Sequence, residues 1–235
     1  MGAADVVPGV SGGTIAFISG IYEELITTIH NIDLGVFKTL KKEGVKKVWH
    51  QYNLGFLASL FTGIAISILS LAKVITMLLG QYPVLVWSFF FGLVIASIIY
   101  IAKQITNYSP KAIIALVLAG VFSYGITLAK PIADTESIWF LFFAGFIAII
   151  AMILPGISGA FILVIIGAYS PVLEAISNRD IKTILIIGTG AIVGLLSFSK
   201  LLRWLFKSYN QLTLAVLTGF MIGSLNKIWP CKVAL

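Results

Sequence analysis

The stretch Asp5–Thr14 reads DVVPGVSGGT, and it decides the fold because it places helix breakers inside an otherwise apolar segment. Proline removes a backbone N–H and disfavours helix in the residue before it, while adjacent glycines free the backbone. A near copy, MILPGISGAF, occupies Met152–Phe161 in the other half of the chain. The sequence therefore predicts two apolar helices that each break at a Pro-Gly-x-Ser-Gly turn.

The composition of the chain is typical of a polytopic membrane protein. Hydrophobic residues make up 59% of the 235 residues and charged residues 11%, and a soluble domain of this length could not bury that much apolar surface. Several uncharged runs have about the ~17–25 residues that a spanning helix needs. These runs are Leu54–Ala72, Pro83–Ala102, Ala112–Ala129, Thr183–Ser199 and Ser208–Asn226. We therefore expect an all-α, multi-pass membrane fold.

The lysines of the long polar stretch, residues 31–52, orient the chain. The positive-inside rule places this stretch in the cytoplasm, so residues 103–111 and 200–207 also lie inside and residues 130–136 lie outside. Its apolar residues fall roughly on one helical face, which favours an interfacial helix on anionic membrane lipids over a nucleic-acid site. The lysines are Lys38, Lys41, Lys42, Lys46 and Lys47, and the apolar residues are Leu34, Phe37, Val45, Val48 and Trp49.

The chain also contains an internal repeat. A shift of 147 residues aligns residues 8–29 with 155–176, and a shift of 127 aligns residues 63–97 with 190–224. The first repeat then covers residues 1–130, with a hairpin, the basic insertion 31–52 and three spans. The second covers residues 137–235, with a hairpin and two spans. Three spans between the breaks predict that the second copy is inverted.

The two copies differ in extent. The second break follows an apolar arm, Ser137–Ala151, whereas only Met1–Val7 precede the first break. The counterpart of the span Ala112–Ala129 would begin past Leu235. We expect a chain shortened at both ends relative to a symmetric ancestor, and a late start codon or a truncated chain explains the pattern equally well.

The second break must lie within the membrane. Residues 137–173 carry no charge, and as one helix they would extend ~55 Å, nearly twice the ~30 Å hydrocarbon core. Leu154 should end the first arm and Ser158 should begin the second, which predicts a re-entrant hairpin; the first break predicts a matching one. Backbone groups freed at such turns must be buried in protein or line a cavity. Two inverted hairpins whose tips meet near the midplane are typical of secondary transporters.

The helices after the breaks would point their N-termini at the membrane centre. Such ends carry unpaired N–H groups and roughly half a positive charge, and they bind anions, phosphate above all. The alternative is that proline and glycine only kink packed helices, but two copies in inverted halves favour a binding site. The predicted substrate-binding residues of the breaks are Pro8, Gly9, Ser11, Gly12, Gly13, Thr14, Pro155, Gly156, Ser158 and Gly159.

Ionisable residues near the breaks are further candidates. Asp5 is either a local cap or a coupling residue that carries a proton, with sodium as the other possible coupling ion. Lys73 and Lys200 are equivalent in the repeat, and Arg203 follows Lys200 by one turn. These three are predicted to guide a phosphate to the breaks; the alternative is that they are snorkelling anchors.

Enzyme chemistry finds no support in the sequence. His30 and His50 lack metal-ligand spacing, and no serine or cysteine has an evident histidine partner within the membrane. The phosphate loop ending in Gly-Lys-Ser/Thr is absent, and a single cysteine, Cys231, excludes a disulfide framework and a cysteine metal cluster. We expect no cofactor and no metal.

Two stretches, MGAADVVPGVSGGTIAFISGIYEELI at residues 1–26 and GFMIGSLNKIWP at residues 219–230, resemble the bacterial polyprenyl-phosphate transporter family. The resemblance implies a flippase that returns undecaprenyl phosphate across the cytoplasmic membrane for cell-envelope synthesis. It leaves the driving ion, the isoprenoid length and a homo-oligomeric state open. The residues alone also permit an ion-coupled carrier or channel for a small inorganic anion, and, third, an intramembrane lipid phosphatase.

Overall fold

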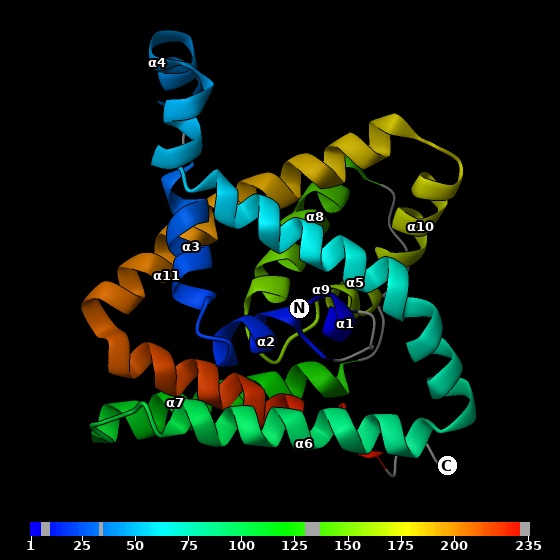
Figure 1. Ribbon diagram of the computed structural model, residues 1–235. Coiled ribbons are helices and arrows are strands. Elements are labelled where there is room, and N and C mark those ends of the chain that lie inside the picture. The colour runs from blue at the N-terminus through cyan, green and yellow to red at the C-terminus, as the bar shows by residue number, and fades with distance from the viewer. Residues whose placement is uncertain (6–9, 33–34, 130–136, 231–235) are drawn as a thin grey trace.

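The computed structural model describes residues 1–5, 10–32, 35–129 and 137–230. All regular structure in these residues is helical, so the all-α prediction is confirmed. Figure 1 shows the short helices α1, α2 and α9 in the middle of the molecule, with the longer helices around them. In the first half of the chain the helices are α1 (Gly2–Asp5), α2 (Gly12–Ile18), α3 (Tyr22–Asn31), α4 (Gly35–Gln51), α5 (Leu54–Gln81), α6 (Pro83–Ala102) and α7 (Pro110–Leu128).

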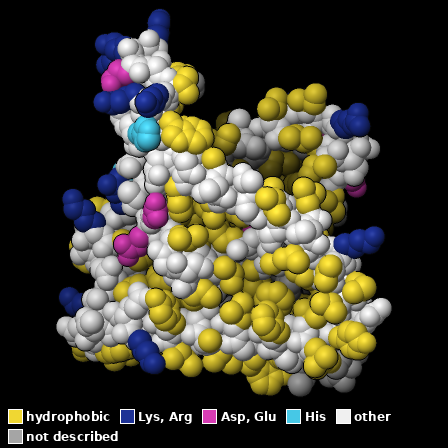
Figure 2. All heavy atoms as spheres, viewed as in Figure 1, with side chains coloured by type: hydrophobic (Ala, Val, Ile, Leu, Met, Phe, Trp, Pro, Cys, Tyr) yellow, Lys and Arg dark blue, Asp and Glu magenta, His cyan; other side chains and the backbone are white. Residues whose placement is uncertain are grey.

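The second half of the chain contains α8 (Ile138–Ile153), α9 (Gly159–Ile165), α10 (Tyr169–Ser177) and α11 (Ile181–Ser224). Four of the described helices, α5, α6, α7 and α11, are long and apolar enough to cross a membrane. Figure 2 shows hydrophobic side chains spread over the long helices, as lipid-facing surfaces require. The protein is therefore a multi-pass membrane protein.

The helix α11 holds both of the last two predicted spans. Its 44 residues would extend ~66 Å if straight, about twice the membrane core. At Tyr209 the backbone leaves helical geometry, with φ −140° and ψ 46°, and Figure 1 shows the helix turning sharply between its two halves. The two halves thus form two separate apolar segments.

Helix α8 ends where the sequence predicted. Its last residue is Ile153 with Leu154 as C-cap, and α9 begins at Gly159 with Ser158 as N-cap. At ~1.5 Å per residue the 16 residues of α8 extend only ~24 Å. The next helices, α9 and α10, meet at an angle of 109°. A re-entrant course through the bilayer stays a prediction, because these lengths fit a broken span as well.

The local geometry after the two breaks recurs at a spacing of 147 residues. Helices α2 and α9 both have seven residues and follow an extended serine. A left-handed glycine lies two residues after the end of each helix, Gly20 with φ 73° and Gly167 with φ 76°. Glycine adopts this conformation without steric cost. The next helix, α3 or α10, begins with a tyrosine in both copies.

A second recurrence follows the shift of 127 residues. Helix α5 begins at Leu54 and α11 begins at Ile181. Tyr82, which separates α5 from α6, has φ −134° and ψ 54°, close to the values at Tyr209. The backbone of α11 therefore follows that of α5 and α6. The division into repeats 1–130 and 137–235, and their inversion in the membrane, stay predictions.

The longest helix packs through glycines. In the first half of α11, a Cβ at Gly190 would collide with the Phe142 carbonyl of α8, and in the second half one at Gly219 would collide with the Leu116 carbonyl of α7. Small residues at such points let helix backbones approach closely within a membrane. Helix α8, which leads into the second break, thus packs against the first half of α11, and α7 packs against the second half.

The basic helix α4 projects from the body of the molecule (Figure 1), and Figure 2 shows its basic side chains gathered there. It is divided at Gly44, which has φ 80°. Val48 is buried, whereas Val45 and Trp49 are exposed; Leu34 and the side chain of Phe37 lie outside the described part. Its role on anionic lipids stays a prediction.

Candidate functional site

The two breaks lie against each other. The backbone N–H of Gly156 donates to the Thr14 hydroxyl at 3.1 Å, and the Ser11 hydroxyl donates to the Leu154 carbonyl at 3.3 Å. Thr14 and Ser11 are buried. These bonds join segments that are more than 140 residues apart in the chain.

Two further contacts tighten this junction. The Tyr22 hydroxyl at the start of α3 donates to the Ile153 carbonyl at 3.2 Å. A Cβ atom at Gly13 would lie 2.6 Å from the same carbonyl oxygen. The first break thus receives the free carbonyls at the end of α8, which a helix C-terminus leaves without intrahelical partners.

The first break is capped from within the chain. Gly12 donates its N–H to Asp5 Oδ1 at 2.8 Å, and Gly13 donates its N–H to the Ser11 hydroxyl at 3.1 Å. These are two of the N–H groups that the sequence predicted for a phosphate. The other Asp5 oxygen, Oδ2, is buried and has no hydrogen-bond partner among the described residues. In this conformation the N-terminus of α2 is occupied by the protein itself.

An apolar cavity of about 190 Å³ borders the first break. Asp5, Gly12 and Gly13 form its polar end. Its apolar walls come from α3, α5, α8 and α11 and include Leu25, Leu60, Ile64, Met152 and Leu195. A cavity with one acid and long apolar walls suits an amphiphile better than a hydrated ion.

The second break has a different surrounding. Ser158 is the N-cap of α9, and its side chain makes no capping hydrogen bond. A cavity of about 10 Å³, roughly the room of one water molecule, lies beside Gly156 and Ser158. The rest of its lining consists of hydroxyl groups of α7 and α11, one lysine and three apolar side chains: Ser123, Thr127, Ser224, Lys227, Ile126, Ile157 and Phe161.

Lys227 lines this cavity but is not among the predicted site residues. Its Nζ lies 4.1 Å from the centre of the Phe161 ring, within the range of a cation–π contact. The neighbouring Asn226 donates to the Thr127 hydroxyl at 3.1 Å. Lys227 belongs to the GFMIGSLNKIWP stretch that carried the family resemblance, and its position directly after an apolar helix was the available signal.

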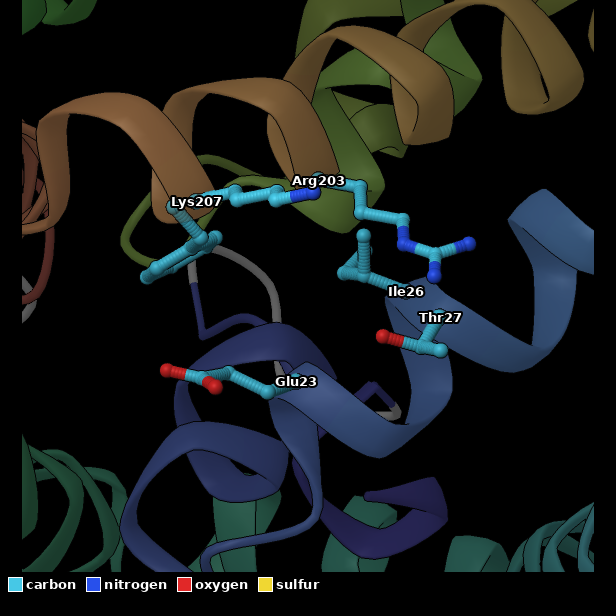
Figure 3. Close-up of a pocket in the computed structure, with 6 residues that line it drawn as sticks. Glu23, Ile26, Thr27, Arg203 and Lys207 are labelled. Carbon is cyan, nitrogen blue, oxygen red and sulfur yellow. The ribbon is translucent and has the colours of Figure 1, made fainter.

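The predicted basic residues do not gather at the breaks. Lys73 on α5 and Lys200 on α11 are exposed, and neither lines the two cavities described above. Arg203 is half-buried, and its Nη1 donates to Asn31 Oδ1 at 2.7 Å. It lines a separate cavity of about 230 Å³ between α3 and α11, together with Lys207 (Figure 3).

The remaining predicted site residues divide into two groups. Pro8 and Gly9 lie outside the described residues. Pro155 is fully buried, and Gly156 has φ 88°, which favours glycine. A Cβ atom at Gly159 would lie 2.6 Å from the Ala148 carbonyl oxygen, so close packing alone requires glycine there. Among the described residues no group of three or more His, Cys, Asp or Glu side chains could hold a metal ion.

Comparison with known proteins agrees with the resemblance. The chain is 48% identical over 235 residues to a polyprenyl-phosphate transporter of Vibrio cholerae, covering 100% of this chain and 76% of the relative. It is 32% identical over 249 residues to a polyprenyl-phosphate transporter of Staphylococcus aureus, covering 98% of this chain and 83% of the relative. No solved structure matches. Residues 1–235 match the undecaprenyl phosphate translocase-like (VCA0040-like) family, and the chain belongs to this family of transporters.

Proposed function

We propose that this protein is a flippase that moves polyprenyl phosphate, such as undecaprenyl phosphate, across the bacterial cytoplasmic membrane for carrier-lipid recycling in cell-envelope synthesis. The observation that carries the proposal is the hydrogen-bonded junction of the two breaks, where Gly156 donates to Thr14. An apolar cavity borders the first break, and a small cavity whose lining includes hydroxyl groups and a lysine borders the second. The names of the two relatives support the substrate.

The substrate has two chemically different ends, and the junction offers a place for each. An isoprenoid chain can lie along the apolar walls of the first cavity, away from the buried Asp5 carboxylate at its polar end. The phosphate needs N–H and hydroxyl donors, which Gly156, Ser158 and Lys227 supply at the second break. Because the second cavity holds about one water, the junction must open before a phosphate enters.

Opening the junction exchanges one set of acceptors for another. In the closed state the Thr14 hydroxyl accepts from Gly156, and Asp5 accepts from Gly12. Phosphate oxygens can take both acceptor positions as the head group passes, so the freed N–H groups do not stay unpaired in a dry site. Pro8, Gly9, Pro155 and Gly159 stay in this proposal as predicted substrate-binding residues of the two Pro-Gly-x-Ser-Gly sequences.

Asp5 is the candidate for coupling within this cycle. An ionised carboxylate beside a phosphate is repulsive, so Asp5 must take up a proton or a cation when the head group reaches Gly12. Its buried Oδ2, which has no partner among the described residues, is the atom on which a proton would reside. A proton is therefore the proposed coupling ion, with sodium as the alternative.

Reconstitution tests the function directly. Full-length protein in liposomes should move a labelled polyprenyl phosphate between leaflets, and Lys227→Gln should slow this movement at least several-fold. Lys182→Gln, an exposed lysine in the first turn of α11, is the control and should leave it unchanged. Flux of inorganic phosphate or chloride without lipid movement would instead assign the alternative, a small-anion carrier or channel, and released phosphate would assign a lipid phosphatase.

Cysteine labelling from each side of the membrane tests the orientation of the protein. A cysteine at Lys42 in α4 should react only from the cytoplasmic side, and one at Asp134, beyond α7, only from outside. Labelling of both positions from one face would contradict the inverted arrangement of the two breaks.

A further inference from the structure

A third cavity, between α3 and α11, lies outside the junction of the breaks. Arg203 and Lys207 project from α11, one helical turn apart, and Glu23, Ile26 and Thr27 line the α3 side (Figure 3). Its volume is about 230 Å³. This volume exceeds that of the cavity at the second break and leaves room for a phosphate group.

The chemistry of this cavity is that of an amphiphilic anion site. Two buried apolar residues, Ile26 and Phe206, line the cavity together with the charged groups. Arg203 uses one N–H for Asn31, which leaves the rest of its five donors for a ligand. Arginine pairs with phosphate oxygens in a bidentate geometry, and Lys207 adds a second cation.

The internal repeat has no equivalent of this cation pair. At the shift of 127 residues that aligns α5 with α11, Arg203 corresponds to Thr76 and Lys207 corresponds to Gly80. Helix α10, the counterpart of α3, packs on α9 and α11, and it makes no contact with α5 in the part of the chain that the structure describes. The cation pair is therefore one-sided, although the two breaks are duplicated.

We infer that Arg203 and Lys207 form a second binding site for the phosphate head group of an isoprenyl lipid, on the side of the membrane where α4 lies. This inference rests on the proposed function, and it assigns the cavity to the stage just before or after the head group passes the junction. Asn31, the last residue of α3, holds Arg203 in place and leads into α4. By the positive-inside rule this is the cytoplasmic side.

Glu23 limits how long a head group stays bound at this site. With Arg203 and Lys207 charged and Glu23 ionised, the lining carries a net charge of +1 against a phosphate monoester of up to −2. The carboxylate repels the bound head group and so limits its residence, as release into the leaflet requires. Removing this charge should therefore tighten binding, and removing either cation should weaken it.

The experiment measures binding of a short-chain isoprenyl phosphate to the full chain in nanodiscs. Arg203→Gln and Lys207→Gln should each weaken binding about 10- to 100-fold, the range expected for one charge-assisted hydrogen bond. Glu23→Gln should strengthen it several-fold. Changes of opposite sign cannot come from a general loss of folding, and Lys182→Gln serves as the control outside the cavity.

Sided assays and two further probes identify the ligand and the face. In liposomes of known protein orientation, the half-saturating concentration should rise in Arg203→Gln when the probe starts on the α4 side and stay unchanged from the other side. The isoprenyl alcohol should bind weakly and without dependence on Arg203. Inorganic phosphate that binds as tightly as the lipid, with the same dependence on Arg203, would overturn the lipid assignment.

The outcomes separate this inference from the proposed function. Unchanged affinity in all three cavity variants, while wild-type protein flips the lipid, would overturn the second site and leave the flippase. Binding with the expected variant effects, but no flipping by wild-type protein, would overturn the flippase and leave the site.

Discussion

At the first break, Asp5 and Ser11 hold the N–H groups of Gly12 and Gly13, whereas at the second break the Ser158 side chain makes no capping bond and Lys227 stands over Phe161. The backbone that follows the two breaks is nearly the same, with helices of seven residues that follow an extended serine. The surrounding side chains are not, since one break faces an acid and apolar walls and the other faces hydroxyls and a cation. A duplicated turn has thus received two different chemical environments.

Under the proposed function, this difference assigns different roles to the two breaks. A break that is already capped is stable when no ligand is present, because its N–H groups have acceptors. A break without a side-chain cap next to a lysine is ready for an anion. We therefore expect substitutions at the first break to act mainly on stability and those at the second to act on both stability and the head group.

The largest effect should come from Gly156→Ala. The residue has φ 88°, and a Cβ would lie 2.8 Å from the Met221 Cα, which is backbone and cannot move aside. A left-handed non-glycine residue costs ~1–2 kcal/mol and overpacking ~1–3 kcal/mol, so we expect a loss of about 2–5 kcal/mol, seen as a lower melting temperature in detergent.

Two other glycines sharpen this test. A Cβ at Gly12 would meet the Asp5 carboxylate at 2.5 Å, a side chain that can turn away, so Gly12→Ala should cost less than Gly156→Ala. Gly188 on α11 has no described atom within 4 Å of a built Cβ, and Gly188→Ala should be neutral or stabilise the helix by up to ~1 kcal/mol. Equal losses at Gly12 and Gly156 would contradict the distinction between a movable and a fixed neighbour.

The next effect concerns the bond that joins the breaks. Thr14→Val keeps the shape of the side chain but leaves the Gly156 N–H without its acceptor at 3.1 Å. An unsatisfied buried donor costs about 1–3 kcal/mol, so the melting temperature should fall and the two breaks should separate more easily. Thr14→Ser restores the hydroxyl and should recover most of the loss; a valine variant as stable as the serine variant would show that the bond contributes nothing.

Much of this architecture could be predicted from the sequence because it depends on local chemistry. Proline and glycine end α8 at Ile153 and start α9 after Ser158, as predicted from the Pro-Gly turn. The break at Tyr209 was also within reach, since Tyr82 ends a span before Pro83 and the shift of 127 residues transfers this boundary to α11.

What the sequence could not give is which distant side chains meet. Arg203 has Lys200 three positions before it and Lys207 four positions after it, and both spacings place neighbours on a helix surface. Only the rotation of α11 against α3 decides that Lys207 lines the cavity and Lys200 does not. Lys227 was missed for the same reason, because its contact with Phe161 depends on where the turn after α11 lies relative to α9.

The smallest effect, and the one that decides the role of Asp5, compares Asp5→Ala with Ser158→Ala. The alanine at Asp5 removes the acceptor of the Gly12 N–H and should cost about 0.5–2 kcal/mol, as the loss of a helix cap does. The alanine at Ser158 removes no capping bond, so the free energy of unfolding should change by only a few tenths of a kcal/mol. Equal losses of unfolding free energy in the two variants would contradict the distinction between a first break with a side-chain cap and a second break without one.

Asp5→Asn then separates capping from proton transfer, because the amide oxygen can still accept from Gly12 but cannot exchange a proton near neutral pH. If Asp5 is only a cap, this variant should keep both its stability and the pH dependence of lipid flipping. If Asp5 carries the coupled proton, stability should stay and the pH dependence should disappear, while flipping down a lipid gradient continues. Flipping rates across a pH series, measured beside thermal unfolding of the same samples, therefore assign the acid at the first break without relying on a change in total activity.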